Sequence, residues 1–133
     1  MTGNRWEGRP GLSVAVIARD EEERLPGCLE SASFADEIVV VDSGSRDRTV
    51  EIARAGGARV LEEPWKGFSR QKQSAVDQCG NDWVLILDAD ERVPGETAAA
   101  ILEALSSRDA SVTAFSFPRK NIFHGRWIRR CGW

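Results

Sequence analysis

Short apolar runs and helical patterns alternate along this chain. Val84–Leu87 is an unbroken run of aliphatic side chains, which predicts a strand buried on both faces. Val112–Phe117 alternates between apolar and polar residues, which also predicts a strand. With three further apolar runs, the predicted strands are Leu12–Ala18, Glu37–Val41, Ala58–Leu61, Val84–Leu87 and Val112–Phe117.

Between these runs, apolar residues recur with the spacing of one helix face. Pro26 fits the first turn of the first helix, Gly56 ends the second, and Pro94 begins the last. The predicted inward faces are Leu25, Cys28, Leu29 and Ala32; Thr49, Ile52 and Ala53; Ala75, Val76 and Cys79; and Ala98, Ile101, Leu102 and Leu105. Strands that alternate with helices predict an α/β fold with a parallel sheet covered on both faces.

The composition fits one small globular domain. The chain has 133 residues, of which 41% are hydrophobic and 29% charged, and a net charge of −3 that provides no basic field for nucleic acid. Cys28, Cys79 and Cys131 have no metal-site or disulfide-framework spacing, which favours a reducing compartment. Because Met1–Pro10 is polar and no apolar run could span a bilayer, we expect a cytoplasmic protein.

Polar clusters follow three of the predicted strands. They are Arg19–Glu21, Asp42–Ser45 and Asp88–Glu91. The carboxyl ends of parallel strands meet at one edge of a sheet, and ligands bind in the crevice there. These clusters are therefore predicted to share one site.

Asp88 and Asp90 have two interpretations. Carboxylates at the end of a strand can bind Mg²⁺ or Mn²⁺ together with a substrate phosphate, or they can form a solvated acidic turn. In the first interpretation Asp90 is the metal ligand, and Asp88 binds the metal through water or holds a ribose. The metal would stabilise negative charge on a leaving nucleotide.

Two other residues have a functional and a structural interpretation. Asp42 could accept hydrogen bonds from a ribose or a base, or it could form an Asx-turn. Lys72 could pair with a phosphate or lie in solvent as a surface lysine. The chain has no Walker A motif and no G-x-G-x-x-G. Its single histidine argues against a Cys-His or Ser-His nucleophile.

The C-terminal segment combines aromatic and basic residues. From Pro118 to Trp133 there are five basic residues and no acid. It could form an acceptor-site wall, contact an anionic membrane surface peripherally, or pack on further protein, as a hairpin or a loop.

Four motifs carry a resemblance to a known family: LSVAVIARDEEERLPGCLES, ADEIVVVDSGSRDRT, GFSRQKQSA and WVLILDADE. The chain resembles the N-terminal part of glycosyltransferase family 2 enzymes, and within them the bacterial β-1,4-glucosyltransferases of lipopolysaccharide core assembly. The resemblance implies the GT-A fold, a Rossmann-like three-layer α/β/α arrangement with a mainly parallel sheet. It also implies an inverting sugar transfer from a nucleotide-sugar, most often UDP-linked, with Mg²⁺ or Mn²⁺.

The resemblance also assigns roles by position. Ala18 and Asp20 would border the nucleotide, Asp42 would contact the base or ribose, and Lys72 would lie near the base or phosphates. Asp88 would lie near the ribose and Asp90 would bind the metal. The family usually has Asn-Glu where this chain has Asp20-Glu21, so Asp20 adds negative charge near the diphosphate, for which Arg19 could compensate.

Family members continue well beyond the position of Trp133. We therefore expect a flexible arm over residues 1–11 and an incomplete nucleotide-sugar-binding domain over residues 12–133, with the acceptor part and catalytic base beyond Trp133. Such a fragment is expected to be weak or inactive as a transferase. We expect the protein to be localised in the cytoplasm or at the inner face of the cytoplasmic membrane.

The acceptor is expected to be a lipopolysaccharide core or a related glycan, with a polyprenyl phosphate as the alternative. Two alternatives to a glycosyltransferase belong to other classes of protein. A sugar nucleotidyltransferase would carry a glycine-rich basic loop where this chain has Arg-Asp-Glu-Glu-Glu. A non-catalytic nucleotide-binding domain would be separated from an enzyme only by an activity assay.

Overall fold

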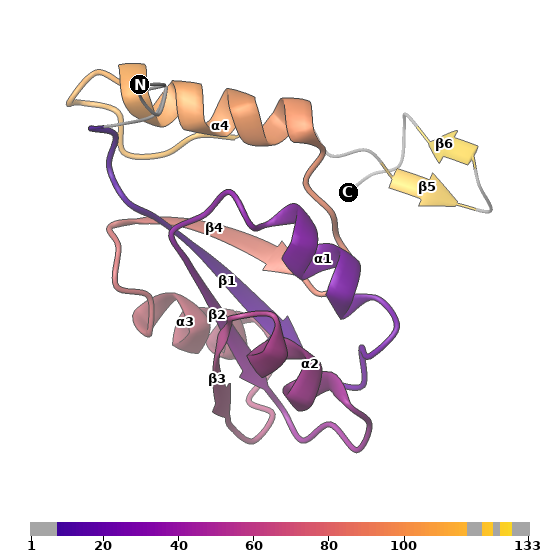
Figure 1. Ribbon diagram of the computed structural model, residues 1–133. Helices are drawn as coiled ribbons and strands as arrows, with labels where there is room; N and C mark the ends of the chain where they lie inside the picture. Colours follow the sequence, from indigo (N-terminus) through magenta and orange to yellow (C-terminus); the bar gives the residue numbers. More distant parts are fainter. Residues whose placement is uncertain (1–7, 117–120, 124–125, 129–133) are drawn as a thin grey trace.

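A parallel sheet forms the centre of the computed structural model, which describes residues 8–116, 121–123 and 126–128 (Figure 1). Four strands form it in the order β3-β2-β1-β4. They are β1 (Leu12–Ala18), β2 (Glu37–Asp42), β3 (Arg59–Glu62) and β4 (Trp83–Asp88). The four corresponding sequence predictions are confirmed: the bounds of β1 are as predicted, and those of β2, β3 and β4 shift by at most one residue. β1 pairs on both sides and is buried along nearly its whole length.

Helices cover both faces of the sheet (Figure 1). They are α1 (Leu25–Ser31), α2 (Thr49–Ala55), α3 (Phe68–Asp77) and α4 (Gly95–Ser107). The larger core lies between the sheet and α1, α2 and α4, where the predicted faces of α1 and α2 are buried or packed against it. A smaller core lies under α3, around Ala15, Val41 and Ala75. The predicted α/β fold with two covered faces is confirmed.

The prediction that β4 is buried on both faces is wrong at its middle. Ile86 is 46% exposed, whereas Leu87 on the opposite face is buried. β4 lies at the edge of the sheet within the described part of the chain, and α3 lies mainly over β1 and β2. The helix layer therefore ends before it reaches Ile86. An aliphatic run cannot distinguish a central strand from an edge strand.

The predicted strand Val112–Phe117 is also wrong over residues 112–116, which have no regular structure; Phe117 is outside the described residues. Phe115 instead packs its ring on Trp83, with centroids 5.3 Å apart. The Arg108 guanidinium lies 5.2 Å from the Trp83 centroid. This segment makes side-chain contacts without a ladder of backbone hydrogen bonds, and alternation alone does not provide a partner strand.

The C-terminal segment contains a short antiparallel pair of strands, β5 (Asn121–Phe123) and β6 (Arg126–Ile128). Of the two predicted structures, a hairpin or a loop, the hairpin is therefore confirmed. Its other positions, including the basic residues 119, 120, 129 and 130, lie outside the described residues, and so do the side chains of the hairpin. The membrane-contact interpretation of this segment remains a prediction. Among the helices of the described chain, none is long and apolar enough to cross a bilayer.

The register of the sheet positions the candidate site. Ala18 pairs with Asp42 across β1 and β2, and Ile17 pairs with Asp88 across β1 and β4. The ends of three strands are thus level at one edge. The polar clusters that follow them must lie side by side, as the sequence predicted.

Candidate functional site

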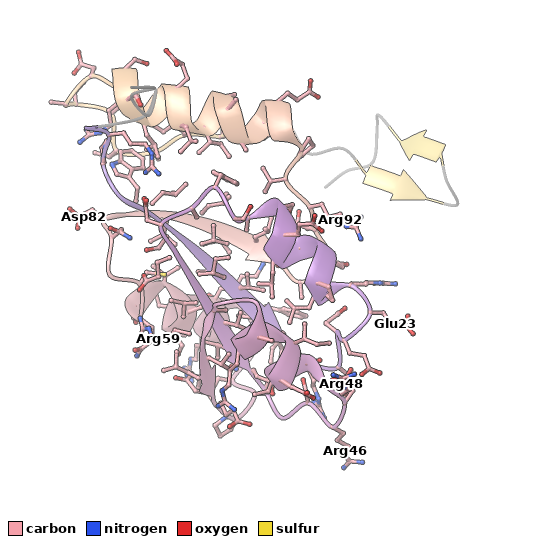
Figure 2. The ribbon with its side chains drawn as sticks, viewed as in Figure 1. Glu23, Arg46, Arg48, Arg59, Asp82 and Arg92 are labelled. Carbon is pink, nitrogen blue, oxygen red and sulfur yellow. The ribbon has the colours of Figure 1, made fainter. Side chains whose placement is uncertain are left out.

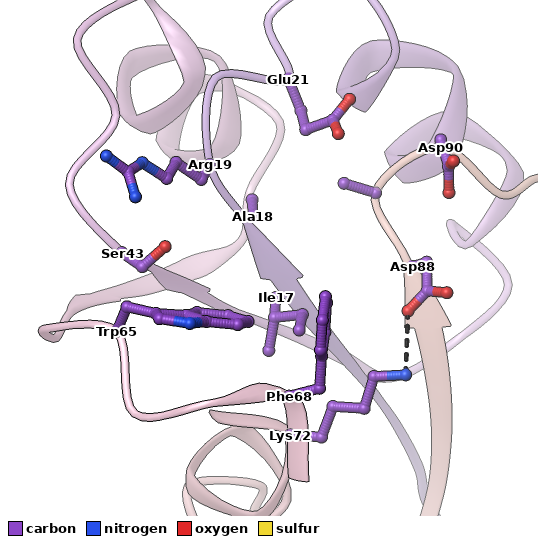
Figure 3. A pocket seen from close by; sticks show the side chains of 11 residues that line it. Ile17, Ala18, Arg19, Glu21, Ser43, Trp65, Phe68, Lys72, Asp88 and Asp90 are labelled. Atoms are coloured by element: carbon purple, nitrogen blue, oxygen red, sulfur yellow. Dashed lines mark ion pairs between the residues drawn. The ribbon is translucent and has the colours of Figure 1, made fainter. Parts of the chain in front are cut away.

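A cleft of about 450 Å³ opens at the carboxyl edge of the sheet (Figure 3). Four of the predicted site residues line it, namely Ala18, Lys72, Asp88 and Asp90. The other lining residues are Ile17, Arg19, Glu21, Ser43, Trp65, Phe68 and Ala89. The two remaining predicted residues, Asp20 and Asp42, do not line it. The cleft is therefore built from the ends of β1, β2 and β4 and from the segment that enters α3.

Lys72 and Asp88 form an ion pair across the cleft. Lys72 Nζ lies 3.2 Å from Asp88 Oδ1, and the two side chains are 34% and 37% exposed (Figure 3). Lys72 comes from the second turn of α3, one turn after Phe68. At this exposure the pair contributes at most about 1 kcal/mol to folding. A bound phosphate could therefore replace Asp88 as the partner of Lys72 at little cost.

The turn after β4 holds Asp88 in place. The Asp88 backbone N–H donates to Glu91 Oε1 at 2.9 Å, and the Glu91 N–H donates to the Asp88 carbonyl at 2.9 Å. The Cys28 thiol donates to the same carbonyl at 3.5 Å. Burial raises the pKa of this thiol to about 12, so Cys28 stays protonated as a small core residue.

The Asp90 carboxylate is about half exposed and makes one weak ion pair. Its Oδ2 is 3.8 Å from Arg24 Nη1, and their side chains are 49% and 67% exposed, which makes this a weak surface pair. Burial, and then the charge of Asp90, raise the pKa of Glu21, which also lines the cleft, against the effect of Arg24. The mouth of the cleft therefore has an excess of negative charge around Asp90.

These carboxylates suit a hard divalent cation. Within the described residues, no group of three or more His, Cys, Asp or Glu side chains is close enough to hold a metal by itself. Mg²⁺ commonly takes one or two carboxylates and completes its coordination with water and substrate phosphate. Asp90 and Asp88, both open to the cleft, fit that smaller set of ligands.

Asp42 uses its carboxylate within its own turn. The side chain is fully buried, and its Oδ2 accepts hydrogen bonds from the backbone N–H groups of Gly44 at 3.0 Å and Ser45 at 2.8 Å. Its Oδ1 accepts from the Ser45 hydroxyl. Gly44, with φ of 95°, permits the turn. This is the Asx-turn interpretation, and a contact between Asp42 and a nucleotide remains a prediction.

Asp20 joins two loops at the rim of the site. It has a positive φ of 52°, its N–H donates to Ser45 Oγ at 2.8 Å, and its Oδ1 accepts from the Arg46 N–H at 2.8 Å. The neighbouring Glu21 N–H donates to Thr49 Oγ1 at 2.8 Å. These bonds lock the loop after β1 to the loop after β2. They also engage the Asp20 carboxylate outside the cleft, and its contact with nucleotide remains a prediction.

Sequence reasoning missed the aromatic wall. Trp65 and Phe68 lie in an edge-to-face arrangement with ring centroids 4.9 Å apart, and they are 46% and 71% exposed. A signal was available, because the loop that follows the strand at Leu61 must also reach the carboxyl edge of a parallel sheet. An aromatic pair around Gly67 in that loop should have been included in the site.

Comparison with known proteins identifies the family. Residues 13–131 match the model of glycosyl transferase family 2. An uncharacterized glycosyltransferase of Rickettsia typhi is 43% identical over 86 residues, covering 64% of this chain and 30% of the relative. The lipopolysaccharide core biosynthesis glycosyltransferase LpsC of Rhizobium meliloti is 40% identical over 106 residues, covering 76% of this chain and 39% of the relative.

A solved structure supports the same assignment. Glucosyl-3-phosphoglycerate synthase from Mycobacterium tuberculosis, in complex with Mn²⁺, UDP and glucosyl-3-phosphoglycerate, superimposes with a TM-score of 0.54 at 29% identity. The match covers 62% of this chain and 34% of the synthase. This chain thus spans about a third of the length of the proteins it matches. The expected GT-A fold is confirmed, and the chain belongs to glycosyl transferase family 2.

Proposed function

We propose that this chain forms the donor-binding part of a metal-dependent glycosyltransferase that takes a sugar from a UDP-sugar. One observation carries the proposal: Lys72, Asp88 and Asp90 meet in a single cleft at the carboxyl edge of the sheet. The similarity to a synthase crystallised with Mn²⁺ and UDP supports the choice of nucleotide and metal. The similarity to LpsC supports a lipopolysaccharide core glycan as the acceptor, and the family resemblance supports inversion.

Each residue has a role in donor binding. Lys72 leaves Asp88 and donates to a diphosphate oxygen, which places a positive charge where negative charge develops in the reaction. Asp88 is then free to bind the metal or the ribose, and Asp90 binds the metal. When present, the cation neutralises charge on the departing nucleoside diphosphate. The locked loops after β1 and β2 keep the floor of the cleft in place while the ligand binds.

Thermal unfolding tests the proposal. The chain is melted with UDP, GDP and ADP, each with and without Mn²⁺. A ligand at about 100 times its Kd should add roughly 2.7 kcal/mol to the free energy of unfolding. We expect stabilisation by UDP that requires Mn²⁺ and is lost in Asp90→Asn.

Asp82→Asn is the matched control. Asp82 is an exposed acid in the turn before β4, at the opposite end of that strand from the cleft (Figure 2). It should keep the full response to UDP. A chain that melts cooperatively but responds to no nucleotide would refute the proposal, and so would a response that persists in Asp90→Asn.

A further inference from the structure

The aromatic wall of the cleft exposes apolar surface that the fold does not require. Phe68 is the most exposed large hydrophobic residue of the described chain, at 71%, and Trp65 beside it is 46% exposed. Phe68 is the first residue of α3, Trp65 lies just before this helix, and both side chains line the cleft. Large apolar side chains that gather at a cleft are typical of a ligand-binding surface.

Hydrogen bonds and an ion pair fix the loop that carries Trp65 and Phe68. Gln71 is fully buried, and its Oε1 accepts a hydrogen bond from the Lys66 backbone N–H at 3.1 Å. Lys66 Nζ lies 2.8 Å from Glu63 Oε2 and 2.5 Å from Ser74 Oγ. Gly67, with φ of 93°, turns the chain into α3 between the two aromatic residues. The rings are therefore presented to the cleft in a fixed arrangement, which lowers the entropy cost of binding.

The cleft divides into an acidic part and a part with an aromatic face. Figure 3 shows Asp88 and Asp90 on one side, and Trp65 near Ser43 and Arg19 on the other. Phe68 stands between Trp65 and Lys72. A ligand that matches this division has a charged group joined to a planar ring, as a nucleoside diphosphate has.

We propose that Trp65 stacks on the nucleobase of the donor, with Phe68 supporting the indole ring edge-on. The inference rests on the proposed function, because it assigns one part of the same donor site. The transferred sugar is joined to the diphosphate at the end remote from the base. If the phosphates lie at Lys72, Asp88 and Asp90, the ring on the Ser43 side is the base and the sugar lies beyond Asp90.

Calorimetric titration of the chain with two ligands tests this assignment. UDP and inorganic pyrophosphate, each with Mn²⁺, share the charged part and differ in the base. Stacking of a base on an aromatic side chain corresponds to a loss of about 5-fold to 100-fold in affinity when the ring is removed. Trp65→Ala should weaken UDP binding by that factor and leave pyrophosphate binding unchanged. Trp65→Leu, which keeps apolar bulk but has no aromatic face, should show the same loss, and Trp65→Tyr should restore most of the affinity.

Two other variants separate the possible failures. Lys72→Ala should weaken both ligands, because it removes the phosphate contact. Phe115→Ala is the control, because it removes an aromatic ring of similar exposure, 44% against 46% for Trp65. Phe115 packs on Trp83 at the start of β4, away from the cleft, so this variant should weaken the binding of neither ligand. The stacking assignment is overturned if Trp65→Ala leaves UDP binding intact, or weakens both ligands equally, while Lys72→Ala behaves as expected. Failure of the unmodified chain to bind either ligand would instead overturn the proposed function, and the assignment with it.

Discussion

At the scale of single residues, the proposed function requires that Lys72 exchange its ion pair with Asp88 for a contact with the ligand. The Lys72 ammonium group pairs with Asp88 at 3.2 Å while a third of each side chain remains exposed. Such a pair is easily exchanged for another anion, because water already screens much of the attraction.

We expect Lys72→Met to separate stability from affinity. The free energy of unfolding should change by less than about 1 kcal/mol, because a partly exposed pair contributes little. UDP affinity in the presence of Mn²⁺ should fall by about tenfold or more, since a charge-assisted hydrogen bond to phosphate is lost. Urea unfolding and calorimetry measure the two quantities. A large loss of stability with unchanged affinity would make Lys72–Asp88 a structural ion pair only.

The sequence predicted part of the site because strand ends are visible in a hydrophobic pattern. Asp88 and Asp90 come at the end of an apolar run, and the parallel topology brings them beside the end of β1, whereas Ala18 was assigned through the family resemblance. The pattern could not show where the Asp42 carboxylate points, because an Asx-turn and a ligand contact use the same residue at the same position. Trp65 and Phe68 were missed because two aromatic residues in a loop have no spacing that distinguishes the wall of a cleft from packing in the core.

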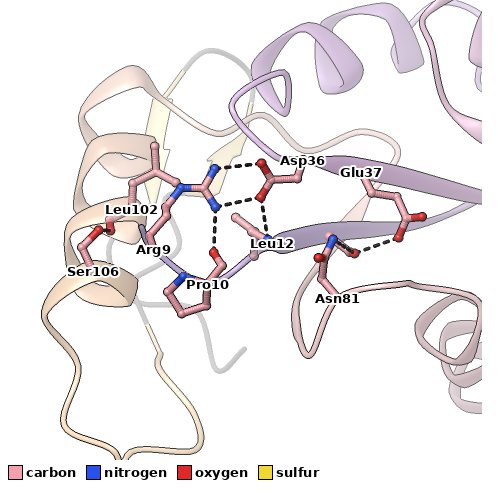
Figure 4. Close-up of polar contacts among 9 residues, drawn as sticks. Arg9, Pro10, Leu12, Asp36, Glu37, Asn81, Leu102 and Ser106 are labelled. Carbon is pink, nitrogen blue, oxygen red and sulfur yellow. Dashed lines mark hydrogen bonds and ion pairs between the residues drawn. The ribbon is translucent and has the colours of Figure 1, made fainter. Parts of the chain in front are cut away.

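At the scale of elements, Glu37 on β2 connects β1, β3 and the turn before β4. Figure 4 shows the Glu37 and Asn81 side chains near each other. Glu37 Oε1 accepts from Ser13 Oγ at 2.8 Å on β1 and from the Gly80 N–H at 2.7 Å before β4, and Arg59 on β3 lies 3.6 Å from Oε2. The Asn81 side chain donates in turn to Ser13 Oγ at 3.0 Å. The hydrogen bond from Gly80, followed by those from Ser13 and the charge of Arg59, holds the pKa of Glu37 below its ordinary value of 4.5.

This shift gives a pH dependence with a definite sign. A lowered pKa means that the charged form is favoured by folding, so the contribution of Glu37 is complete above about pH 4.5 and is lost as the pH falls through the lowered pKa. Glu37→Gln should therefore lower the free energy of unfolding by about 1 kcal/mol near neutral pH. The difference from the unmodified chain should shrink as the pH falls below 4.5.

Urea unfolding over this pH range measures the effect, with Glu62→Gln as the control. Glu62 is an exposed acid at the end of β3, and its nearest cation, Arg54, is 3.8 Å away. Its removal should change stability little at any pH. A constant difference between Glu37→Gln and the unmodified chain from neutral to acid pH would contradict the assignment.

The segment before α3 depends on Gln71 in a comparable way. Gln71→Met keeps the buried volume but removes the acceptor for the Lys66 N–H. We expect a loss of about 1 kcal/mol in the free energy of unfolding, because a partly buried N–H loses its hydrogen-bond partner. UDP affinity should fall while pyrophosphate affinity stays constant, since only the aromatic loop is loosened. Gln73→Met, on the exposed face of the same helix, should change neither affinity. Equal weakening of both ligands would show that Gln71 supports the helix as a whole.

An element could be predicted where its structure depends on the residues of one segment alone. The faces of α1 and α4 follow from apolar spacing within one segment, and both are packed as predicted. The edge position of β4 and the irregular course of residues 112–116 depend on which segments lie beside them. That information is not contained in the periodicity of the segment itself.

At the scale of the whole molecule, the open edge of the sheet is a consequence of the strand order. Within the described residues, β4 pairs only with β1, and the side chain of Ile86 is 46% exposed on the face that α3 leaves uncovered. A strand edge with free N–H and C=O groups beside exposed aliphatic surface can pair with another copy of the chain. We therefore expect concentration-dependent self-association of this chain at high micromolar concentration.

Ile86→Lys should suppress this association without loss of stability. A charge on an edge strand opposes edge-to-edge pairing, and Ile86 contributes little to the core because nearly half of it is exposed. Sedimentation velocity over a range of concentrations measures the association, and thermal unfolding checks that the fold is intact. Ala99→Lys places the same charge on the exposed face of α4 and should leave association unchanged. If both variants suppress association equally, net charge is the cause; if neither does, the contact lies elsewhere than the β4 edge.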